Sequence, residues 1–390
     1  MVAAIEAARR GNEVTIFEKK DSVGKKILAT GNGRCNFTNM NMSEKYYYTD
    51  NPEFIKIAYD KFGNRDLILY MMGLGLLSKV KNGYVYPASE QASSVLDSLL
   101  YELFDLNVNI VTNACVSGIT EKNNGFEIVL EDEKKFSFDK VILSTGGRSG
   151  LPKKEHCNSY ELLESLNIKY TRLYPALTQV KAANIDLKPL SGVRSDCNLH
   201  VFADGELQIT EEGEVLFTDY GLSGIVTFQV SHFVAEMDDK KVPVTIVLDL
   251  IPGVDYEEFE EIIKQRLLLL KDRTVEEFFA GIHNRKLNEV IIKLHGLDPN
   301  KSISDYDSDV ILECALNYKE FMVPVKGVKG YDSSQVTAGG IPTDLLTESF
   351  EVKNHPGLFV TGELINVDGI CGGFNLQWAF SSGYIAGNAV

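Results

Sequence analysis

Three segments of this sequence carry residue types that could bind a dinucleotide. Glu18 closes the run Glu-Val-Thr-Ile-Phe-Glu at 13–18, and an acid at the end of such a strand can accept hydrogen bonds from ribose hydroxyls. Residues 31–36 read Gly-Asn-Gly-Arg-Cys-Asn. Their glycines let the backbone approach a ligand closely, and Arg34 can pair with a phosphate. Taken alone, this second segment fits a tight structural turn equally well.

The third segment lies near the C-terminus. Gly362 and Glu363 are followed by Asp-Gly-Ile-Cys-Gly-Gly-Phe-Asn-Leu-Gln-Trp at 368–378. Two glycines directly before a helix leave its first N–H groups free to bind an anion. A reduced flavin develops negative charge at N1 and O2, so a helix start at that position would stabilise it by about 0.3–2 kcal/mol. The segment therefore indicates a flavin site.

The elements that must position these residues follow an α/β order. Residues 2–10 predict an amphipathic helix that leads into the strand at 13–18, which is the second half of a βαβ unit. The first half and its G-x-G-x-x-G fingerprint do not occur in the chain. We expect both to lie upstream of Met1, in a longer protein whose N-terminus is truncated here. Because the first strand is usually central in a parallel sheet, we also expect low solubility or poor stability for the 390-residue form.

The middle of the chain has a different character. Alternating segments at 198–203, 206–210 and 243–249 predict strands, and the stretch at about 256–319 is helical and charged. The α/β character resumes after residue 335. The predicted domains are the first part of a cofactor-binding domain at 1–167, an inserted β-rich domain at 168–334 with a helical subdomain at about 256–319, and the C-terminal part of the cofactor-binding domain at 335–390.

Composition excludes several classes of protein. A formal net charge of −16 argues against nucleic acid or an anionic membrane as the main partner. No apolar run approaches the roughly 20 residues that cross a bilayer. The six cysteines form no C-x-x-C pair and lie near no histidine cluster, so they fit neither a disulfide framework nor a zinc site and favour a cytoplasmic location. Cys35 and Cys371 lie in glycine-rich loops, where a packing role is favoured over a role near a reaction centre.

Several motifs resemble the BaiN/RdsA-type (YhiN-like) flavoproteins. They occur in that family's order, at 31–39, 83–87, 144–147, 214–218, 221–224, 335–340 and 361–383. The resemblance covers nearly the whole chain. It implies a GR2-type Rossmann-like FAD-binding domain, here without its first strand and glycine fingerprint, with an inserted β-barrel domain and a helical subdomain. It also implies a non-covalently held FAD.

The segments and the resemblance together assign a set of residues to the cofactor. The chain departs from the family pattern between Pro152 and Tyr160, where a Gly/Ser-rich loop is usual. No side chain stands out as a catalytic acid or base; Tyr220 and His232 could donate a proton, but a core or surface role is favoured for both. The run Tyr46–Tyr48 is interpreted as packing. The cofactor-binding residues predicted are Glu18, Lys19, Lys26, Gly31, Gly33, Arg34, Cys35, Asn36, Cys115, Val116, Thr145, Gly146, Gly147, Gly362, Glu363, Asp368, Gly369, Gly372, Gly373, Phe374, Asn375 and Leu376.

The resemblance implies an FAD-dependent oxidoreductase. In the leading interpretation, NADH or NADPH gives hydride to flavin N5, which passes it to a small organic substrate such as a steroid or bile-acid enone. One alternative is a flavin oxidase of a small amine such as aminoacetone, and another is a cofactor-poor scaffold without activity. We expect a small-molecule substrate, no nucleic acid, no stable membrane association, and a monomer or homodimer.

Overall fold

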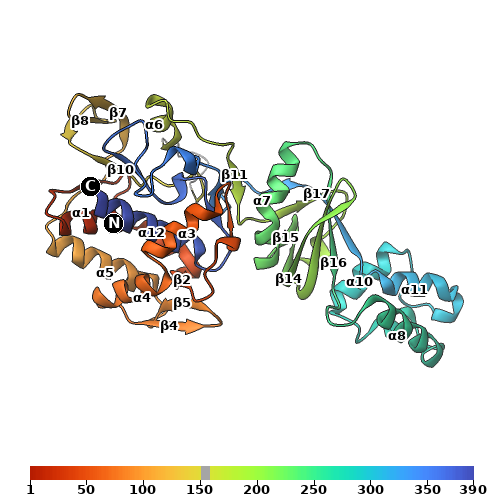
Figure 1. Cartoon of the computed structure of the whole chain (residues 1–390). Helices are drawn as coiled ribbons and strands as arrows, with labels where there is room; N and C mark the ends of the chain where they lie inside the picture. The colour runs from red at the N-terminus through yellow and green to blue at the C-terminus, as the bar shows by residue number, and fades with distance from the viewer. Residues whose placement is uncertain (151–158) are drawn as a thin grey trace. The chain divides into compact units, whose positions relative to one another are not determined.

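The computed structural model describes residues 1–150 and 159–390 (Figure 1). Contacts between residues divide the chain into two compact units. The first unit comprises Met1–Tyr174 and Gln335–Val390, and the second is Pro175–Ser334. The domain limits that we predicted at residues 168 and 335 remain a proposal for where the cofactor-binding and inserted domains meet.

The first unit mixes helices with short strands. Its helices are α1 (Val2–Arg9), α2 (Lys25–Ala29), α3 (Pro52–Lys61), α4 (Asn64–Gly73), α5 (Ala92–Asp105), α6 (Ser159–Ser165) and α12 (Phe374–Ala389). Its strands are β1 (Thr15–Phe17), β2 (Thr38–Asn39), β3 (Tyr47–Tyr48), β4 (Ser78–Lys81), β5 (Tyr84–Pro87), β6 (Asn109–Val111), β7 (Val116–Lys122), β8 (Gly125–Leu130), β9 (Lys135–Phe138), β10 (Val141–Leu143), β18 (Val336–Ala338), β19 (Leu358–Val360) and β20 (Asp368–Gly369). One more strand, β11 (Tyr174–Ala176), begins at the last residue of this unit's first segment.

Parallel strand pairs bring the predicted site segments to common edges. β1 pairs with β6, and β10 pairs with β19 in the register Val141↔Leu358. Both pairs are parallel, so each needs a long crossover connection, and the carboxyl ends of the paired strands lie at the same edge. Glu18 follows β1, whereas Gly146 and Gly362 follow β10 and β19. β10 is thus a parallel strand that leads into the turn at Gly146 and Gly147.

The C-terminal helix α12 packs against the N-terminal helix α1, and the two chain ends lie side by side in Figure 1. Small residues make this possible. A Cβ atom on Gly387 would lie 2.4 Å from the carbonyl oxygen of Ala3. Asn388 closes the contact by donating to Glu6 Oε2 and by accepting from Arg10. The small-residue composition of α12 therefore serves close approach to α1.

The second unit is built on a closed six-stranded antiparallel barrel. Going around the barrel, its strands are β12 (Val180–Ala182), β15 (Gly221–Ser223), β14 (Glu206–Thr218), β13 (Arg194–Ala203), β16 (Val244–Asp249) and β17 (Phe321–Val328). Helix α7 (Ile225–Asp239) follows β15 and shares its hydrophobic core. The inserted β-barrel that the resemblance implied is confirmed.

One strand is longer than the sequence indicated. We predicted a strand at 206–210, but β14 continues to Thr218. The acidic residues from Glu211 to Glu214 pair with β13 in continuous antiparallel register. Charged side chains fit such a strand because one of its faces meets solvent.

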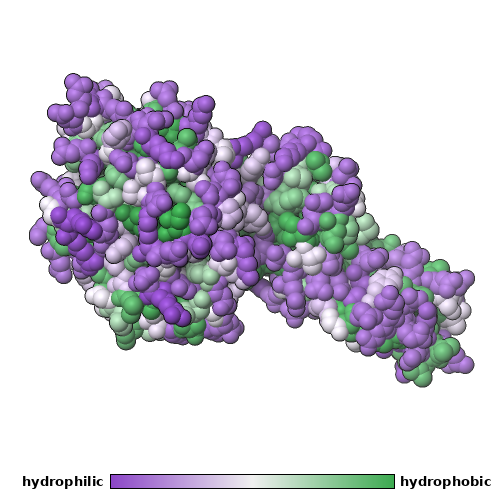
Figure 2. Space-filling model, in the orientation of Figure 1, coloured by the Kyte–Doolittle hydropathy of each residue, from purple (hydrophilic) through white to green (hydrophobic). Residues whose placement is uncertain are grey.

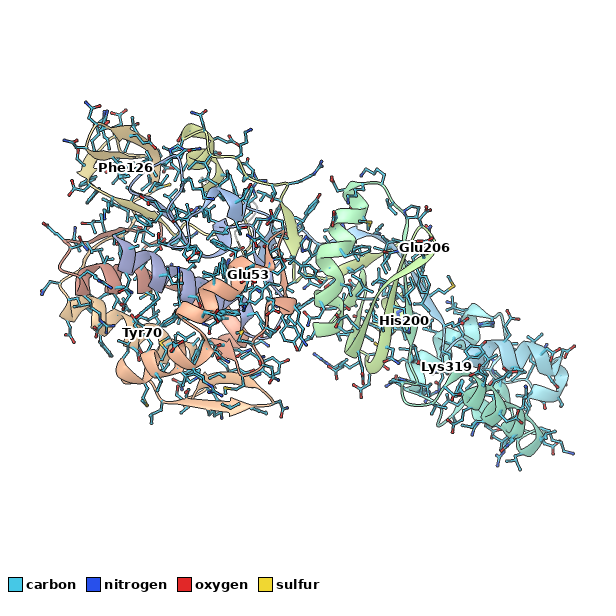
Figure 3. All side chains as sticks on the ribbon, in the orientation of Figure 1. Glu53, Tyr70, Phe126, His200, Glu206 and Lys319 are labelled. Carbon is cyan, nitrogen blue, oxygen red and sulfur yellow. The ribbon has the colours of Figure 1, made fainter. Side chains whose placement is uncertain are left out.

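A helical subdomain is inserted between β16 and β17. Its helices are α8 (Tyr256–Leu269), α9 (Val275–Phe279), α10 (Arg285–Leu294) and α11 (Ser308–Leu316). The chain enters it through residues 250–255 and leaves it through residues 317–320. Lys319, labelled in Figure 3, joins the two connections, because its ammonium donates to Asp249 Oδ2 at 2.7 Å, to the Ile251 carbonyl at 3.0 Å and to the Val254 carbonyl at 2.5 Å. Its side chain is only 5% exposed, so all three protons are satisfied inside the protein.

Hydrophilic residues cover most of the face shown in Figure 2. Apolar side chains are exposed on α4, on β4 and directly before β4, namely Leu69, Met72, Val80 and Leu77. Among the helices of the described residues, none is long and apolar enough to span a membrane.

Lys319→Met should lower the free energy of unfolding by about 3–5 kcal/mol, because Asp249 would stay buried without its cation. Chemical denaturation measures this loss. Lys326→Met is the matched control, since Lys326 is exposed on the neighbouring strand β17, and it should change stability by less than about 0.5 kcal/mol. Equal effects of the two substitutions would contradict the role assigned to Lys319.

Candidate cofactor site

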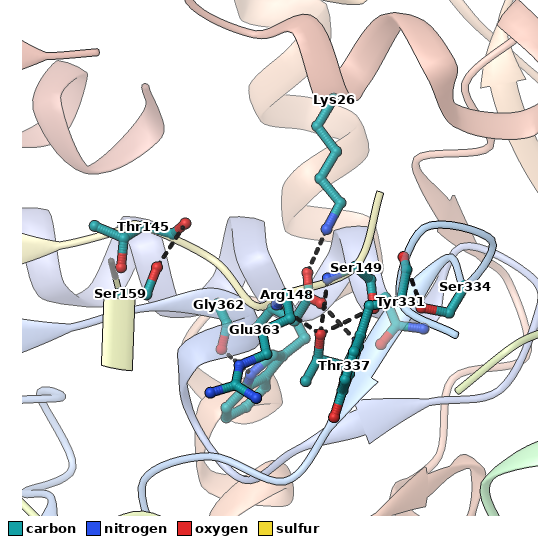
Figure 4. Close-up of polar contacts among 12 residues, drawn as sticks. Lys26, Thr145, Arg148, Ser149, Ser159, Tyr331, Ser334, Thr337, Gly362 and Glu363 are labelled. Carbon is teal, nitrogen blue, oxygen red and sulfur yellow. Dashed lines mark hydrogen bonds and ion pairs between the residues drawn. The ribbon is translucent and has the colours of Figure 1, made fainter. Parts of the chain in front are cut away.

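Glu363 is the centre of the polar contacts drawn in Figure 4. It lies in the turn that follows β19. Its Oε1 atom accepts a hydrogen bond from the Thr337 N–H at 2.7 Å, and its Oε2 atom accepts from Lys26 Nζ at 2.5 Å. The Glu363 side chain is 16% exposed and that of Lys26 55% exposed. A backbone donor and a charged side chain therefore hold this carboxylate in one orientation.

The preceding residue, Gly362, is fixed by α12. Its N–H donates to Ser382 Oγ at 2.9 Å, and its carbonyl accepts from the Trp378 indole at 3.1 Å. Gly362 has a φ of +66°, a conformation that glycine adopts readily. The position of Glu363 thus depends directly on the position of α12.

The glycine turn after β10 packs onto the same carboxylate. A Cβ atom on Gly147 would lie 2.5 Å from Thr337 Oγ1 and 2.6 Å from Glu363 Oε1, so no larger residue fits without displacing them. Thr337 Oγ1 also accepts from the N–H groups of Arg148 at 2.8 Å and Ser149 at 3.0 Å. Gly146 is different: a Cβ atom there would meet nothing within 4 Å, but its φ is +69°. One glycine serves close packing and the other serves the left-handed turn.

The start of α12 presents free backbone donors. Gly373 precedes the helix with a φ of +94°, and a Cβ atom on it would lie 2.7 Å from the Thr38 carbonyl. Within residues 1–150 and 159–390, no acceptor is found for the N–H groups of Phe374, Asn375 and Leu376. These groups carry the positive end of the helix dipole. The arrangement suits an electron-rich ligand edge.

The loop before α12 is closed on itself. Asn375 Oδ1 accepts from the Gly369 N–H at 2.8 Å, and Asn375 Nδ2 donates to the Gly369 carbonyl at 2.6 Å. Asn39 Nδ2 donates to the Gly372 carbonyl at 3.0 Å. Asp368 and Gly369 pair with Tyr48 and Tyr47 in the two-stranded sheet of β20 and β3. The loop is therefore shaped before any ligand binds.

The loop at 31–36 meets this helix start. Asn36 Oδ1 accepts from the Val85 N–H at 3.1 Å and would lie 3.0 Å from a Cβ atom on Gly373. The structure thus brings the second and third predicted segments together. Gly31 and Gly33 have φ values of +54° and +81°. The Arg34 guanidinium lies 5.9 Å from the centre of the Tyr86 ring.

A second group of predicted residues lies after β1 and β6. The Glu18 carbonyl accepts from the Ala114 N–H at 2.9 Å, and Glu18 Oε1 accepts from the Lys20 N–H at 2.9 Å. Lys19 and Cys115 line one cavity of about 400 Å³. The other lining residues are Asn113, Ala114, Leu130, Glu131 and Asp132. Val116 begins β7 directly beyond it.

The remaining predictions have mixed outcomes. The Thr145 carbonyl accepts from Ser159 Oγ at 3.4 Å, close to the glycine turn. Tyr220 and His232 lie in the second unit, where Lys329 Nζ is 3.5 Å from the centre of the Tyr220 ring. Most of the departure between Pro152 and Tyr160 falls at 151–158, outside the described residues, and this includes Cys157.

Sequence reasoning missed two residues. Thr337 was noticed only as part of a family motif, although a Thr two residues before the pair Gly339 and Gly340 hints at a crowded backbone. Tyr47 was interpreted as packing, and it is 7% exposed as expected. Its hydroxyl, however, donates to the Phe374 carbonyl at 2.7 Å, which no local pattern predicts.

Of the two cysteines near the site, Cys35 is buried and Cys371 is partly buried. Desolvation raises the pKa of the Cys35 thiol to about 11 and that of the Cys371 thiol to about 12. Because the thiolate is the nucleophile, both groups are inert at neutral pH. This favours the packing role predicted from the sequence.

The parallel pairs, the glycine turns after them and the inserted barrel define a Rossmann-type α/β protein. The chain belongs to the family described as HI0933-like protein Rossmann domain, which matches residues 1–389. This family consists of FAD-binding flavoproteins, and the chain is accordingly a flavoprotein oxidoreductase, as its sequence predicted.

Three curated relatives match nearly the whole chain. The 3-dehydro-bile acid delta(4,6)-reductase of Clostridium scindens is 34% identical over 396 residues, covering 100% of this chain and 96% of that protein. The ribosomal RNA dihydrouridine synthase of Escherichia coli is 28% identical over 397 residues, covering 98% and 93%. The synthase of the same name from Haemophilus influenzae is 25% identical over 390 residues, covering 98% and 94%.

Gly147→Ala should weaken FAD binding far more than Gly146→Ala does. Both substitutions should lower the free energy of unfolding. Gly147→Ala should cost about 1–3 kcal/mol through overpacking. Gly146→Ala should cost about 1–2 kcal/mol because alanine disfavours a left-handed φ. Only the first displaces Glu363 and Thr337. FAD titration followed by fluorescence distinguishes the two variants. Equal losses of affinity would contradict the close packing of Gly147 on the cofactor site.

Iodoacetamide at pH 8 should leave Cys35 and Cys371 unmodified in the folded protein. Their thiolate fractions are very small at that pH because the pKa values are about 11 and about 12. Alkylation should accelerate as the pH rises towards those values. Mass spectrometry of peptides measures the modification, with the urea-unfolded protein as control. Rapid labelling of Cys371 in the folded protein at pH 8 would show that it is a reactive thiol.

Proposed function

We propose that this chain binds FAD non-covalently and reduces a carbon–carbon double bond conjugated to a carbonyl group in a small, steroid-like substrate. The observation that carries the proposal is the 34% identity with a 3-dehydro-bile acid delta(4,6)-reductase over the entire chain. The name of that relative describes double bonds conjugated to a 3-oxo group. Because that relative is named a reductase, we propose that the flavin takes its electrons from NADH or NADPH and does not pass them to oxygen.

The residues present fit FAD. Glu18 lies where an acid accepts hydrogen bonds from ribose hydroxyls. Gly146 and Gly147 allow close approach of a ligand beside Glu363, whose carboxylate can accept hydrogen bonds from further hydroxyls. The N–H groups of Asn375 and Leu376 can hold the electron-rich edge of the flavin ring. The ion pair with Lys26 would hold Glu363 in this orientation.

FAD held by these residues and reduced would supply the hydride that such a conjugated double bond accepts, and the addition also requires a proton. The chain's own contribution is to orient and tune. Glu363 and the loop at 369–374 are held by backbone contacts, so little reorganisation accompanies the reaction. We assign the proton to no side chain.

Charge favours a small substrate over ribosomal RNA. Dihydrouridine is uridine with its C5–C6 bond saturated, and this bond is conjugated to a carbonyl, so both kinds of relative act on similar bonds. The unit at 175–334, however, contains 28 Asp and Glu against 16 Lys and Arg, and so carries 12 of the chain's 16 net negative charges. Such a surface repels a polyanion.

Purified protein reconstituted with FAD should oxidise NADH or NADPH in the presence of a 4,6-dien-3-one steroid. The absorbance of the nicotinamide measures the rate, and the mass of the steroid should rise by two hydrogens for each double bond reduced. Glu363→Gln, which weakens the ion pair with Lys26, should bind FAD less tightly and turn over more slowly.

Three controls separate the alternatives. Saturation of uridines in ribosomal RNA without steroid reduction would replace the proposed substrate class. Peroxide formation with aminoacetone in air would indicate an amine oxidase. A protein that takes up no FAD would contradict the flavoenzyme function altogether and leave the scaffold interpretation.

A further inference from the structure

We propose that Tyr47 is a positioning residue that holds the loop at 369–374 and thereby raises the reduction potential of FAD bound at the start of α12. The inference rests on the proposed FAD binding. The inference adds Tyr47 to the residues that act on FAD, and Tyr47 lies in a part of the chain that no predicted cofactor motif includes.

Tyr47 fastens both ends of this loop. Its backbone pairs with Gly369 in the sheet of β3 and β20. Its side-chain hydroxyl donates to the Phe374 carbonyl at 2.7 Å. The ring also packs edge-on against the Phe374 ring, with 5.9 Å between the ring centres and 85° between the planes. One residue thus fixes the loop where it begins and where it becomes a helix.

The Tyr47 ring also packs closely against Gly369 at the start of the loop. A Cβ atom on Gly369 would lie 3.0 Å from the Tyr47 ring, so this glycine leaves room for the tyrosine. The Tyr47 ring therefore packs against the start of the loop at Gly369, and the Tyr47 hydroxyl binds the end of the loop at Phe374. Without the hydroxyl, the Phe374 carbonyl loses a partner in a buried environment.

Hydrogen-bond directions around Tyr47 are fixed by proton count. A phenol has one proton, and that of Tyr47 is given to the Phe374 carbonyl. The contact with the Tyr59 hydroxyl must then be a bond that Tyr59 donates. Burial raises the pKa of both phenols, that of Tyr47 well above its usual value, so both remain donors at every physiological pH. Met42 Sδ, 3.3 Å from the Tyr59 hydroxyl, is a second acceptor for the Tyr59 proton, whereas the Tyr47 proton lies on the shorter bond to Phe374.

The consequence for FAD follows from the helix dipole. The favourable effect of a helix N-terminus on negative charge falls off within the first turn, so it depends on where that turn lies. A reduced flavin carries more negative charge at N1 and O2 than the oxidised form. Holding Phe374 in place keeps the N–H groups of Asn375 and Leu376 at that charge and favours reduction.

Tyr47→Phe is the test, with Tyr46→Phe as the matched control. The Tyr46 ring also packs against Phe374, at 5.0 Å between ring centres, but its hydroxyl has no hydrogen-bond partner within the described residues. The first readout is hydrogen–deuterium exchange of the loop at 369–374 in FAD-free protein. The second is the midpoint potential of bound FAD, measured by dye equilibration.

In Tyr47→Phe we expect faster exchange of the loop and a lower potential. The affinity for reduced FAD should fall about tenfold more than that for oxidised FAD, equivalent to about 30 mV for two electrons. Tyr59→Phe should change the exchange rate of the loop and the potential of FAD in the same direction but by less. It replaces Tyr47→Phe as the test variant if Tyr47→Phe does not fold. Unchanged exchange, or faster exchange with an unchanged potential, would overturn the inference. Failure of the unmodified protein to bind FAD would instead contradict the proposed function, while exchange would still test the loop contact.

Discussion

The first unit depends on one contact, the hydrogen bond between the Glu363 carboxylate and the Thr337 N–H. Gly147 packs against both residues. These contacts join the turns after β10 and β19 to Thr337 in β18 and, through Lys26, to the N-terminal part of the chain. The side chains of Thr337 and Glu363 lie so close to Gly147 that no Cβ atom fits at position 147. Because each turn follows a strand of the same parallel pair, the pairing of β10 with β19 and the geometry of the carboxylate are set together.

Buried polar bonds extend this constraint along α12. Gln377 accepts from the Thr38 hydroxyl at 2.6 Å and donates to Ser381, which in turn donates to the Phe62 carbonyl. Buried polar networks are costly when incomplete and specify one arrangement when complete. The helix start is thus positioned before a ligand arrives, which is what electrostatic preorganisation requires. The barrel unit has its own device, the Lys319 ammonium, which holds its helical subdomain independently of the site.

Local sequence signals predicted the parts of this protein that local physics determines. Glu18 after a strand, paired glycines before α12 and the alternation of β13 are visible in neighbouring residues. The family and the inserted barrel were likewise recognisable. Thr337 and Tyr47 were not, because their roles come from partners far away in the chain; Tyr47 and Phe374 are 327 residues apart. The length of β14 was missed because pairing with β13 carries the strand beyond Thr210.

Together these contacts support a site that passes electrons from FAD to a conjugated double bond in a small, steroid-like substrate. Anaerobic single turnover is the sharpest test: the FAD-loaded protein is reduced with dithionite, freed of reductant and mixed with a 4,6-dien-3-one steroid. We expect the absorbance of oxidised flavin to return while the steroid gains two hydrogens per flavin. A flavin that stays reduced with the steroid, yet is reoxidised by oxygen or by ribosomal RNA, would contradict this function of the site.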